Sequence, residues 1–541
     1  MECAIDMPFN LRFIGNTFTI NSNDVAINLH YNWNGAIDFK NVPIQNCANM
    51  FQEFGHFNSP VELPNTVTNC SRMFQGTSTF NSPVTFANDS HIDNCALMFF
   101  RSGINQLPTF SENCTINIAP NMFESCFNFN KPVTIQGRVF NNPNNAYYGM
   151  FSSCNNMNSD VVVDAQNCQW LLSGCGNFNA AITFTPNVKD ITGVLAQCVK
   201  FNRGVVMPNS IVSAGYLFRS CTNFNSSVQF SNNLSNADSM FQSCTNYNVV
   251  TDLPSSLVSA DTMFQYCRKF NRPLTIPSTI KSMSSFLYGC NNFNSAITLP
   301  SHSNFYCAGM FAECVNFNLP VVFNSIGGTL CESFSNTFLN CVKFNYPVNI
   351  PNGVKECFGT FKGCANFNQS ISLPQSILNT CNMFSGCTNF NYAVTFPSKS
   401  YTSYSIRGYS YSSFFPSVRS MFNGCVKFNS AIGTLPKFGN SDSLDEGYEY
   451  IFNGCTNFNK PITFPSAQIK GFRSIFNGCT KLNQTFDLTV TTVPYSFDDT
   501  FNGCTSQSKP IYILNDISKS AKNDIRDTWS SQAKACVVWQ D

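Results

Sequence analysis

The chain has 541 residues, with 31 basic and 30 acidic side chains, and charged residues make up only 11% of it. This balance disfavours nucleic-acid binding, which depends on neutralising phosphates, and the 43% hydrophobic content disfavours a disordered chain. No apolar stretch is long enough to span a membrane, and the first residues have no cationic and apolar segments like those of a signal peptide.

Residues 1–43 precede the regular part of the sequence. Apolar and polar residues alternate in the segments 11–14 and 26–31, which is typical of strands with one buried face. A stack of repeats exposes apolar residues at its ends unless a cap covers them. We therefore predict that residues 1–43 form an N-terminal β cap or attachment segment.

A repeat of about 23 residues occupies residues 44–514. Its regular copies read Met-Phe-x-x-Cys-x-x-Phe-Asn, as from Met263 to Asn271. We call the position of this cysteine the ladder position. Six successive cysteines there are each 23 residues from the next, namely Cys175, Cys198, Cys221, Cys244, Cys267 and Cys290. Three earlier copies have Phe54, Thr77 and Ser102 at the same position, which gives about 19 repeats.

A short alternating apolar pair follows the motif in each repeat, for example Val133 with Ile135 or Ile462 with Phe464. Such alternation predicts one short strand per repeat. Because a single unit of this length cannot bury its own apolar side chains, neighbouring units must stack and share a core. The sequence therefore predicts a solenoid that occupies residues 44–514.

The unit Met-Phe-x-x-Cys-x-x-Phe-Asn-x-Pro-Val-x-Phe-Pro resembles the BspA-like leucine-rich repeat, especially its Phe-Asn variant. That variant occurs in bacterial and mycoplasma surface proteins and also in viral and phage proteins. The resemblance implies an α/β solenoid, a right-handed leucine-rich-repeat coil with a short parallel β-strand per repeat, capped at both ends. It also implies adhesion and ligand binding without catalysis.

The 27 cysteines invite a metal or disulfide interpretation. Zinc sites need closely spaced pairs such as C-x₂-C, which are absent here, and the four histidines are scattered, so we expect no metal. Equivalent residues of adjacent repeats lie ~4.8 Å apart, which would allow disulfides. Since the side chains of one column point the same way, we interpret most cysteines as reduced packing residues, made in a reducing cytoplasm. Whether any adjacent pair is bridged stays open.

An asparagine follows the aromatic residue in successive repeats. We expect its amide to hydrogen-bond to backbone groups of its own and neighbouring repeats. The members of this structural column include Asn179, Asn202, Asn225, Asn248, Asn271 and Asn294.

Three insertions interrupt the period and are candidate partner-binding loops, because tyrosine and serine are common in binding surfaces. The alternative is that they are tolerated surface loops without a ligand. Their candidate residues are Tyr147 and Tyr148 in the first, Tyr401, Tyr404, Arg407, Tyr409 and Tyr411 in the second, and Tyr448 and Tyr450 in the third. The acidic residues of the third insertion lack the spacing of a calcium loop.

Residues 515–541 differ in composition from the repeats. Ile517, Ala521, Ile525 and Trp529 recur at helical spacing among charged residues. This pattern predicts an amphipathic capping helix or tail.

These features indicate a function without catalysis and without cofactors, because no nucleophile–histidine–acid set or phosphate-binding loop is present. We expect a recognition or adhesion solenoid, displayed on a virus (phage) particle or a cell surface, that binds a host protein or glycan. The alternative is a structural virion or scaffold protein that packs against other subunits. Neither nucleic-acid binding nor membrane insertion is expected, and the oligomeric state stays open.

Overall fold

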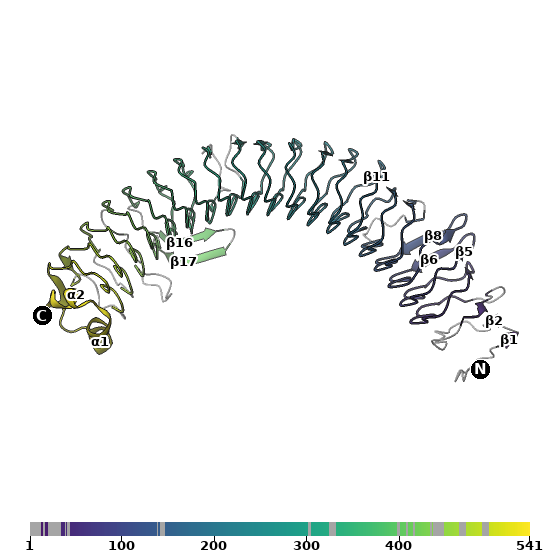
Figure 1. The fold of residues 1–541 in the computed structure, drawn as a ribbon, viewed down its shortest axis with the longest axis horizontal. Helices are drawn as coiled ribbons and strands as arrows, with labels where there is room; N and C mark the ends of the chain where they lie inside the picture. Colours follow the sequence, from purple (N-terminus) through teal and green to yellow (C-terminus); the bar gives the residue numbers. More distant parts are fainter. Residues whose placement is uncertain are drawn as a thin grey trace. The chain divides into compact units, whose positions relative to one another are not determined.

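The computed structural model describes residues 12–14, 17–19, 34–37, 39, 44–137, 139–140, 147–300, 305–323, 332–397, 401–406, 409–414, 417–432, 435, 448–464, 472–489 and 497–541. Contacts between residues group the chain into two compact units, unit 1 (Met1–Cys267) and unit 2 (Arg268–Asp541). In each unit the chain winds through successive turns that stack on one another, and we call each turn a coil (Figure 1).

The strands of the coils are short and pair in parallel, with equivalent residues of successive repeats opposite each other. Val205 pairs with Val228 in unit 1, and Leu274 pairs with Ile297 in unit 2. The predicted parallel β-solenoid is thus confirmed. The strands of unit 1 are β1 (Arg12–Ile14), β2 (Thr17–Thr19), β3 (Ala36–Ile37), β4 (Val61–Leu63), β5 (Val84–Phe86), β6 (His91–Asn94), β7 (Thr109–Phe110), β8 (Thr115–Ile118), β9 (Val133–Ile135), β10 (Val161–Val163), β11 (Ile182–Phe184), β12 (Val205–Val206) and β13 (Val228–Gln229).

Unit 2 contains the remaining strands and, near its C-terminus, two helices. Its elements are β14 (Leu274–Thr275), β15 (Ile297–Thr298), β16 (Tyr401–Ile406), β17 (Tyr409–Phe414), β18 (Phe486–Asp487), β19 (Ile511–Leu514), α1 (Lys519–Thr528), α2 (Ser531–Ala535) and β20 (Val537–Gln540). Antiparallel pairing occurs in β1–β2 and in β16–β17, and the other strand pairs of the described residues are parallel.

A six-residue turn precedes the ladder position of each coil. Backbone N–H groups in it alternate between two kinds of acceptor. In one coil of unit 2, the N–H groups of Phe361 and Gly363 donate to carbonyls of the next coil, those of Met383 (2.9 Å) and Ser385 (2.7 Å). The N–H of Lys362 instead closes a turn within its own coil, at 3.0 Å. This alternation satisfies the backbone of the turn while it ties neighbouring coils together.

Phenylalanine side chains from the repeat motif fill the interior. In unit 2 the rings of Phe361, Phe384 and Phe422 are stacked with centroids 5.7 Å apart at each step. A second ring in the same coil packs beside each of them, as Phe390 does beside Phe384 at 4.2 Å. These rings are fully buried and form a column of stacked aromatic side chains within a core that also contains aliphatic residues such as Ile377 and Met383.

The ladder cysteines add hydrogen bonds to this packing. Cys387 Sγ donates to the carbonyl of Phe361 in the preceding coil at 2.9 Å, and Cys425 Sγ donates to that of Phe384 at 3.0 Å. All cysteines among the described residues are free thiols, and those at the ladder position are buried. The thiols therefore serve as buried donors as well as packing groups, which sequence analysis did not anticipate.

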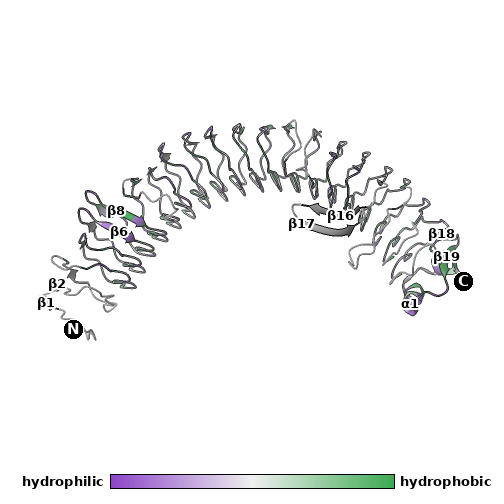
Figure 2. Cartoon of the chain, turned by 180° about the vertical axis from the view of Figure 1, so that it is seen from behind, coloured by the Kyte–Doolittle hydropathy of each residue, from purple (hydrophilic) through white to green (hydrophobic). Residues whose placement is uncertain are grey.

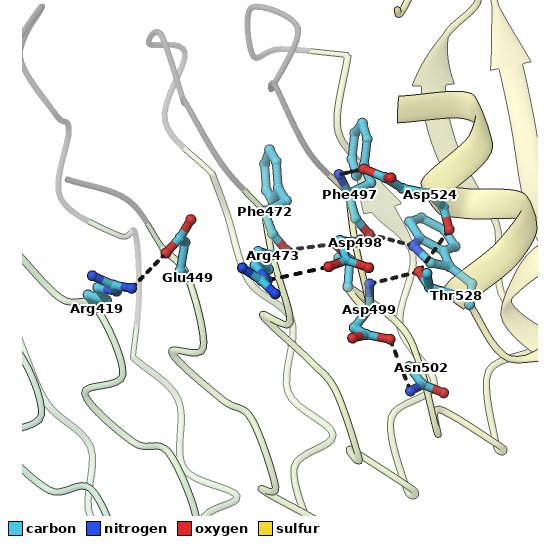
Figure 3. Close-up of polar contacts among 12 residues, drawn as sticks. Arg419, Glu449, Phe472, Arg473, Phe497, Asp498, Asp499, Asn502, Asp524 and Thr528 are labelled. Carbon is cyan, nitrogen blue, oxygen red and sulfur yellow. Dashed lines mark hydrogen bonds and ion pairs between the residues drawn. The ribbon is translucent and has the colours of Figure 1, made fainter. Parts of the chain in front are cut away.

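The C-terminal helix α1 closes the last coil of unit 2. In other coils the N–H groups seven and five residues before the ladder position donate to the next coil. In the last coil the N–H of Phe497 donates to the carboxylate of Asp524 at 3.0 Å, and that of Asp499 donates to the hydroxyl of Thr528 at 2.8 Å (Figure 3). Trp529 Nε1 also donates to the Phe497 carbonyl at 2.8 Å. Side chains of α1 and its C-cap thus replace the missing coil.

The helix is amphipathic, and Figure 2 shows both hydrophilic and hydrophobic residues on it. Ile517, Ala521, Ile525 and Trp529 are all buried. Ser518 caps the helix, since its hydroxyl accepts the N–H of Ala521 at 3.1 Å. Most of residues 1–43 lie outside the described residues, and the predicted domain boundaries at 43/44 and 514/515 stay predictions.

Candidate ligand-binding surfaces

The second insertion forms an antiparallel hairpin of β16 and β17, with Tyr404 opposite Tyr411. The coils on either side keep their register across it, because the N–H of Asn429 still donates to Asn391 Oδ1 at 2.7 Å. The hairpin is therefore an addition to the solenoid and does not interrupt it. The side chains of Tyr401, Tyr404, Tyr409 and Tyr411, and the whole of Arg407, lie outside the described part of the chain, so their binding role stays a prediction.

Two of the predicted loop residues are in the core, and for them the prediction is wrong. Tyr147 is 2% exposed and its hydroxyl donates to the Ile116 carbonyl at 2.9 Å. Tyr448 is 0% exposed and packs against the ring of Phe464 at 5.6 Å. Each lies seven residues before a ladder cysteine, a position that other repeats fill mostly with cysteine, alanine or a larger apolar residue such as Phe334. Counting back from the next ladder cysteine would have placed both in the interior.

Tyr450 is half-buried between two cations of neighbouring coils. The guanidinium groups of Arg419 and Arg473 each lie 6.0 Å from its ring centroid. Arg419 pairs with Glu449 at 3.2 Å and Arg473 pairs with Asp498 at 3.3 Å (Figure 3). This row of alternating charges ties coils together, so the structure gives Tyr450 packing partners within the chain.

Tyr148 belongs to a row of aromatic side chains on the turns of unit 1, which we call the aromatic row. It is 41% exposed, and its ring lies 6.2 Å from that of Trp170. The ring of Trp170 lies in turn 5.8 Å from that of Tyr216. Trp170 and Tyr216 are half-buried and lie in regular repeats, so a search for insertions could not find them. The signal for them was their shared position, five residues before a ladder cysteine.

Gly193 makes this row continuous. It occupies the same turn position in the coil between Trp170 and Tyr216 and has a φ of +66°. A Cβ added to Gly193 would lie 2.5 Å from Cδ2 of Trp170, so the indole lies directly over this glycine. The absent side chain lets Trp170 extend over the intervening coil toward Tyr216.

The predicted asparagine column forms a continuous ladder of hydrogen bonds in each unit. The N–H of Asn225 donates to Asn202 Oδ1 at 2.8 Å, and that of Asn248 donates to Asn225 Oδ1 at 2.8 Å. In unit 2 the N–H of Asn294 donates to Asn271 Oδ1 at 2.8 Å. Amide bonding to the neighbouring coil agrees with our expectation, but the column lies largely at the surface. In unit 1 it lines a shallow polar hollow together with Lys200.

The ladder thiols are poorly suited to nucleophilic chemistry. Burial raises the pKa of Cys126 and of Cys425 well above the ordinary value, and it raises that of Cys504 to about 12. A thiol that keeps its proton is neither a nucleophile nor a metal ligand. Within the described residues no group of three or more His, Cys, Asp or Glu side chains could hold a metal ion. No helix in that part of the chain is long and apolar enough to cross a membrane.

A family model described as "Mycoplasma protein of unknown function, DUF285" matches residues 45–164, 145–253, 209–299, 258–373, 306–414, 355–434 and 396–513. No curated protein matches the chain. Among solved structures, a leucine-rich repeat protein from Bacteroides ovatus is 13% identical, with 99% of each chain covered and a TM-score of 0.34. A leucine-rich cell surface protein from Faecalibacterium prausnitzii is 14% identical, with 72% of this chain and 94% of that chain covered and a TM-score of 0.30.

Proposed function

The chain belongs to the BspA-like repeat family described as Mycoplasma protein of unknown function, DUF285, and we propose that it is a non-catalytic recognition protein that binds a protein or glycan partner. The observation that carries this proposal is the aromatic row of Tyr148, Trp170 and Tyr216. Its rings lie 5.8–6.2 Å apart at partly exposed positions, on turns whose backbones are hydrogen-bonded to one another.

Such a row suits binding rather than catalysis. Tyrosine and tryptophan offer large, rigid contact areas with a polar atom at the rim, and they are enriched where proteins bind partners. The backbone under the row is fixed, since the N–H of Trp170 donates to the Thr192 carbonyl and that of Tyr216 donates to the Asp238 carbonyl, both at 2.8 Å. A preformed surface loses little conformational entropy when a ligand binds.

The test uses the full chain on arrays of extracellular proteins and glycans. We expect the variant W170A/Y216A to lose at least tenfold in affinity for the partner that the parent chain binds. The matched control is F127A, which removes another exposed aromatic side chain of unit 1 (51% exposed) and should change affinity less than twofold. G193A removes none of the three rings, but its added Cβ would displace the indole of Trp170. We therefore expect it to weaken binding as well.

Two results would contradict the proposal: W170A/Y216A binding every partner of the parent chain as tightly as the parent does, or a parent chain that binds no array component. A second variant that lacks residues 398–411 tests the hairpin separately. Display on a virus particle or a cell surface is a further part of the proposal. Mass spectrometry of purified particles and of surface-labelled cells tests it, and detection in neither fraction would exclude such display.

A further inference from the structure

The six residues that follow each ladder position form one edge of the coils, which we call the asparagine edge. In unit 2 these segments hold eight basic residues and no acidic residue, although the chain as a whole has 31 basic and 30 acidic residues. The basic residues are Arg268, Lys269, Arg272, Lys343, Lys427, Lys460, Lys481 and Lys509. The edge is therefore strongly basic within a nearly neutral protein.

Four of these lysines occupy one column, two residues after the ladder cysteine. Read coil by coil, this column is Lys269, Asn292, Asn316, Lys343, Asn366, Asn389, Lys427, Asn457, Lys481 and Ser506. Lysine thus recurs every third coil from Lys269 to Lys427 and again two coils later. Asparagine fills the positions between the lysines.

Hydrogen bonds align this column in space. The N–H groups of Lys343, Asn366, Asn389 and Lys427 each donate to a carbonyl of the preceding coil, at 3.3, 3.1, 3.1 and 3.0 Å. The phenylalanine that follows each of them is stacked on the next, with centroid distances of 6.0, 6.0 and 5.9 Å from Phe344 to Phe428. Lys343 and Lys427 therefore belong to one continuous row, three coils apart, in which the buried rings beside the column are about 6 Å apart at each step.

The neighbouring column of the same edge is the asparagine ladder. It continues without a break from Asn271 to Ser508, each N–H donating to the amide oxygen before it at 2.7–3.0 Å. Because each Oδ1 accepts a backbone N–H, the ladder fixes the orientation of the amides. Each amide still has an N–H₂ group that can donate at the surface.

The four lysines are available for a ligand. Lys269, Lys343, Lys427 and Lys481 are all exposed, and within the described residues none of them forms an ion pair. Lys355 of unit 2, which does form an ion pair, with Glu332 at 2.6 Å, lies off this edge. Among the described residues, the charges of these four lysines are therefore not used in ion pairs.

We propose that the asparagine edge of unit 2 binds a linear acidic polysaccharide along the direction in which the coils stack. A cation every two or three coils matches a polymer with one carboxylate or sulfate every few sugar rings, and the amides between match its hydroxyl groups. Tyr346 and Tyr392, 37% and 43% exposed on the same edge, offer faces for sugar rings. This binding deepens the proposed recognition function, on which it rests, and places it on a second surface.

The alternating pattern favours a polysaccharide over a nucleic acid. Phosphates follow one another without interruption along a nucleic-acid strand, and proteins that bind one present cations in similar density. Two coils out of three in this column carry a neutral amide instead. The hydroxyl groups of a sugar both donate and accept hydrogen bonds, and asparagine amides can also donate and accept them.

The test measures binding of the full chain to heparin, to hyaluronan, to neutral dextran and to single-stranded oligo-dT by biolayer interferometry. We expect hyaluronan, which has one carboxylate for every two sugar rings, to bind in a salt-dependent manner and dextran not to bind, and the densely sulfated heparin serves as a comparison. The variant K269Q/K343Q/K427Q/K481Q should lose at least tenfold in affinity. The matched control K281Q/K362Q/K519Q/K534Q removes four exposed lysines of unit 2 outside the column and should change affinity less than threefold.

A further variant, N366D/N389D, keeps the shape of the column and adds negative charge between Lys343 and Lys427, so it should weaken binding similarly. Equal losses in the column and control variants would overturn the proposal, because they would show unspecific charge attraction. Tighter binding of oligo-dT than of either polysaccharide would also overturn it, as would absence of binding by the parent chain. Since W170A/Y216A in unit 1 leaves this edge intact, it should bind polysaccharide normally, which separates the two surfaces.

Discussion

Units 1 and 2 share an interior but differ in the residues of their turns. In both, buried phenylalanine rings stack and ladder thiols donate to carbonyls of the preceding coil. The residue before the ladder position has positive φ in every coil, yet it is glycine in seven of nine coils of unit 2 and in two of ten coils of unit 1. Unit 1 places residues such as Ser220 and Gln197 there, with φ of +62°.

The asparagine edge differs in the same way. Its segments carry eight basic and no acidic residues in unit 2, against Lys131, Lys200 and Arg203 with Asp160 in unit 1. The aromatic row, in contrast, belongs to unit 1. The comparison teaches that the buried positions are fixed by the requirement to stack, whereas turn and edge positions vary with little effect on the stack. Differences in recognition are therefore expected at the turns and edges.

The largest expected effect concerns what the units share. Burial raises the pKa of the ladder thiols, to about 12 for Cys504 against an ordinary value of 9.0. The folded chain thus keeps protons that the unfolded chain releases, so the stabilisation is complete below pH 9 and is lost as the pH rises toward 12. Each such thiol should lower the free energy of unfolding by about 1.4 kcal/mol per pH unit in that range.

Urea unfolding followed by hydrogen exchange at pH 7 to 11 would measure this loss in each unit. Because the interiors are alike, both units should lose stability above pH 9. The control is C425T/C455T, since Thr77 shows that a buried hydroxyl is accepted at the ladder position and threonine does not titrate there. A steep alkaline loss in one unit alone would break the comparison, and an unchanged slope in the control would remove the thiols as its cause.

The second effect tests whether aromatic stacking is equally important in both units. Phe384 lies 5.7 Å from the ring of Phe361, 5.7 Å from that of Phe422 and 4.2 Å from that of Phe390. We expect F384A to lower the free energy of unfolding by about 3–5 kcal/mol. Most equivalent positions of unit 1 are phenylalanine, but two are leucine, and one of these is Leu195, which is also fully buried.

L195A should lower the free energy of unfolding by about 1 kcal/mol less than F384A does, because leucine makes no ring–ring contacts. Chemical denaturation gives the free energies, and hydrogen exchange shows where protection is lost. Each coil contacts mainly its neighbours, so exchange should rise near the substituted coil. If L195A lowered the free energy of unfolding more than F384A, the stacking of the rings would add nothing to the stability that comes from burying apolar surface.

The period and the buried columns of the repeat could be predicted from the sequence, because burial leaves a periodic trace. Phenylalanine recurs where it is stacked, and Ile525 and Trp529 of the C-terminal segment are buried as their helical spacing indicated. The same reasoning failed for Tyr147 and Tyr448, because insertions shift the period and an interior position looks like part of a loop. Aligning from the next ladder cysteine corrects that error.

The turn and the edges could not be predicted in the same way. Positive φ at residues such as Ser220 leaves no reliable signal, since glycine fills that position mainly in unit 2. Trp170 and Tyr216 become neighbours only because Gly193 lies between them, and only the three-dimensional structure shows this contact. Whole-chain charge concealed the basic edge, because acidic residues elsewhere balance the lysines of that column.

The smallest effect addresses the turn residue itself. Gly424 has a φ of +72°, and a Cβ added there would meet its nearest atom, Cα of Gly386, at an ordinary 3.7 Å. G424A therefore introduces no clash, and its cost is that of a left-handed conformation, about 1–2 kcal/mol. Ser220, whose N–H donates to the Gln242 carbonyl at 2.7 Å, bears this cost already.

S220G removes that strain but gives the unfolded chain more freedom, which offsets about 0.5–1 kcal/mol of the gain. We therefore expect G424A to lower the free energy of unfolding by about 1–2 kcal/mol and S220G to raise it by less than about 1 kcal/mol. S220A, which keeps a Cβ at the same φ, should leave it nearly unchanged and is the matched control. If S220G destabilised the chain as much as G424A does, the serine side chain would have to stabilise its turn. Glycine before the ladder position in unit 2 would then not be the less strained residue.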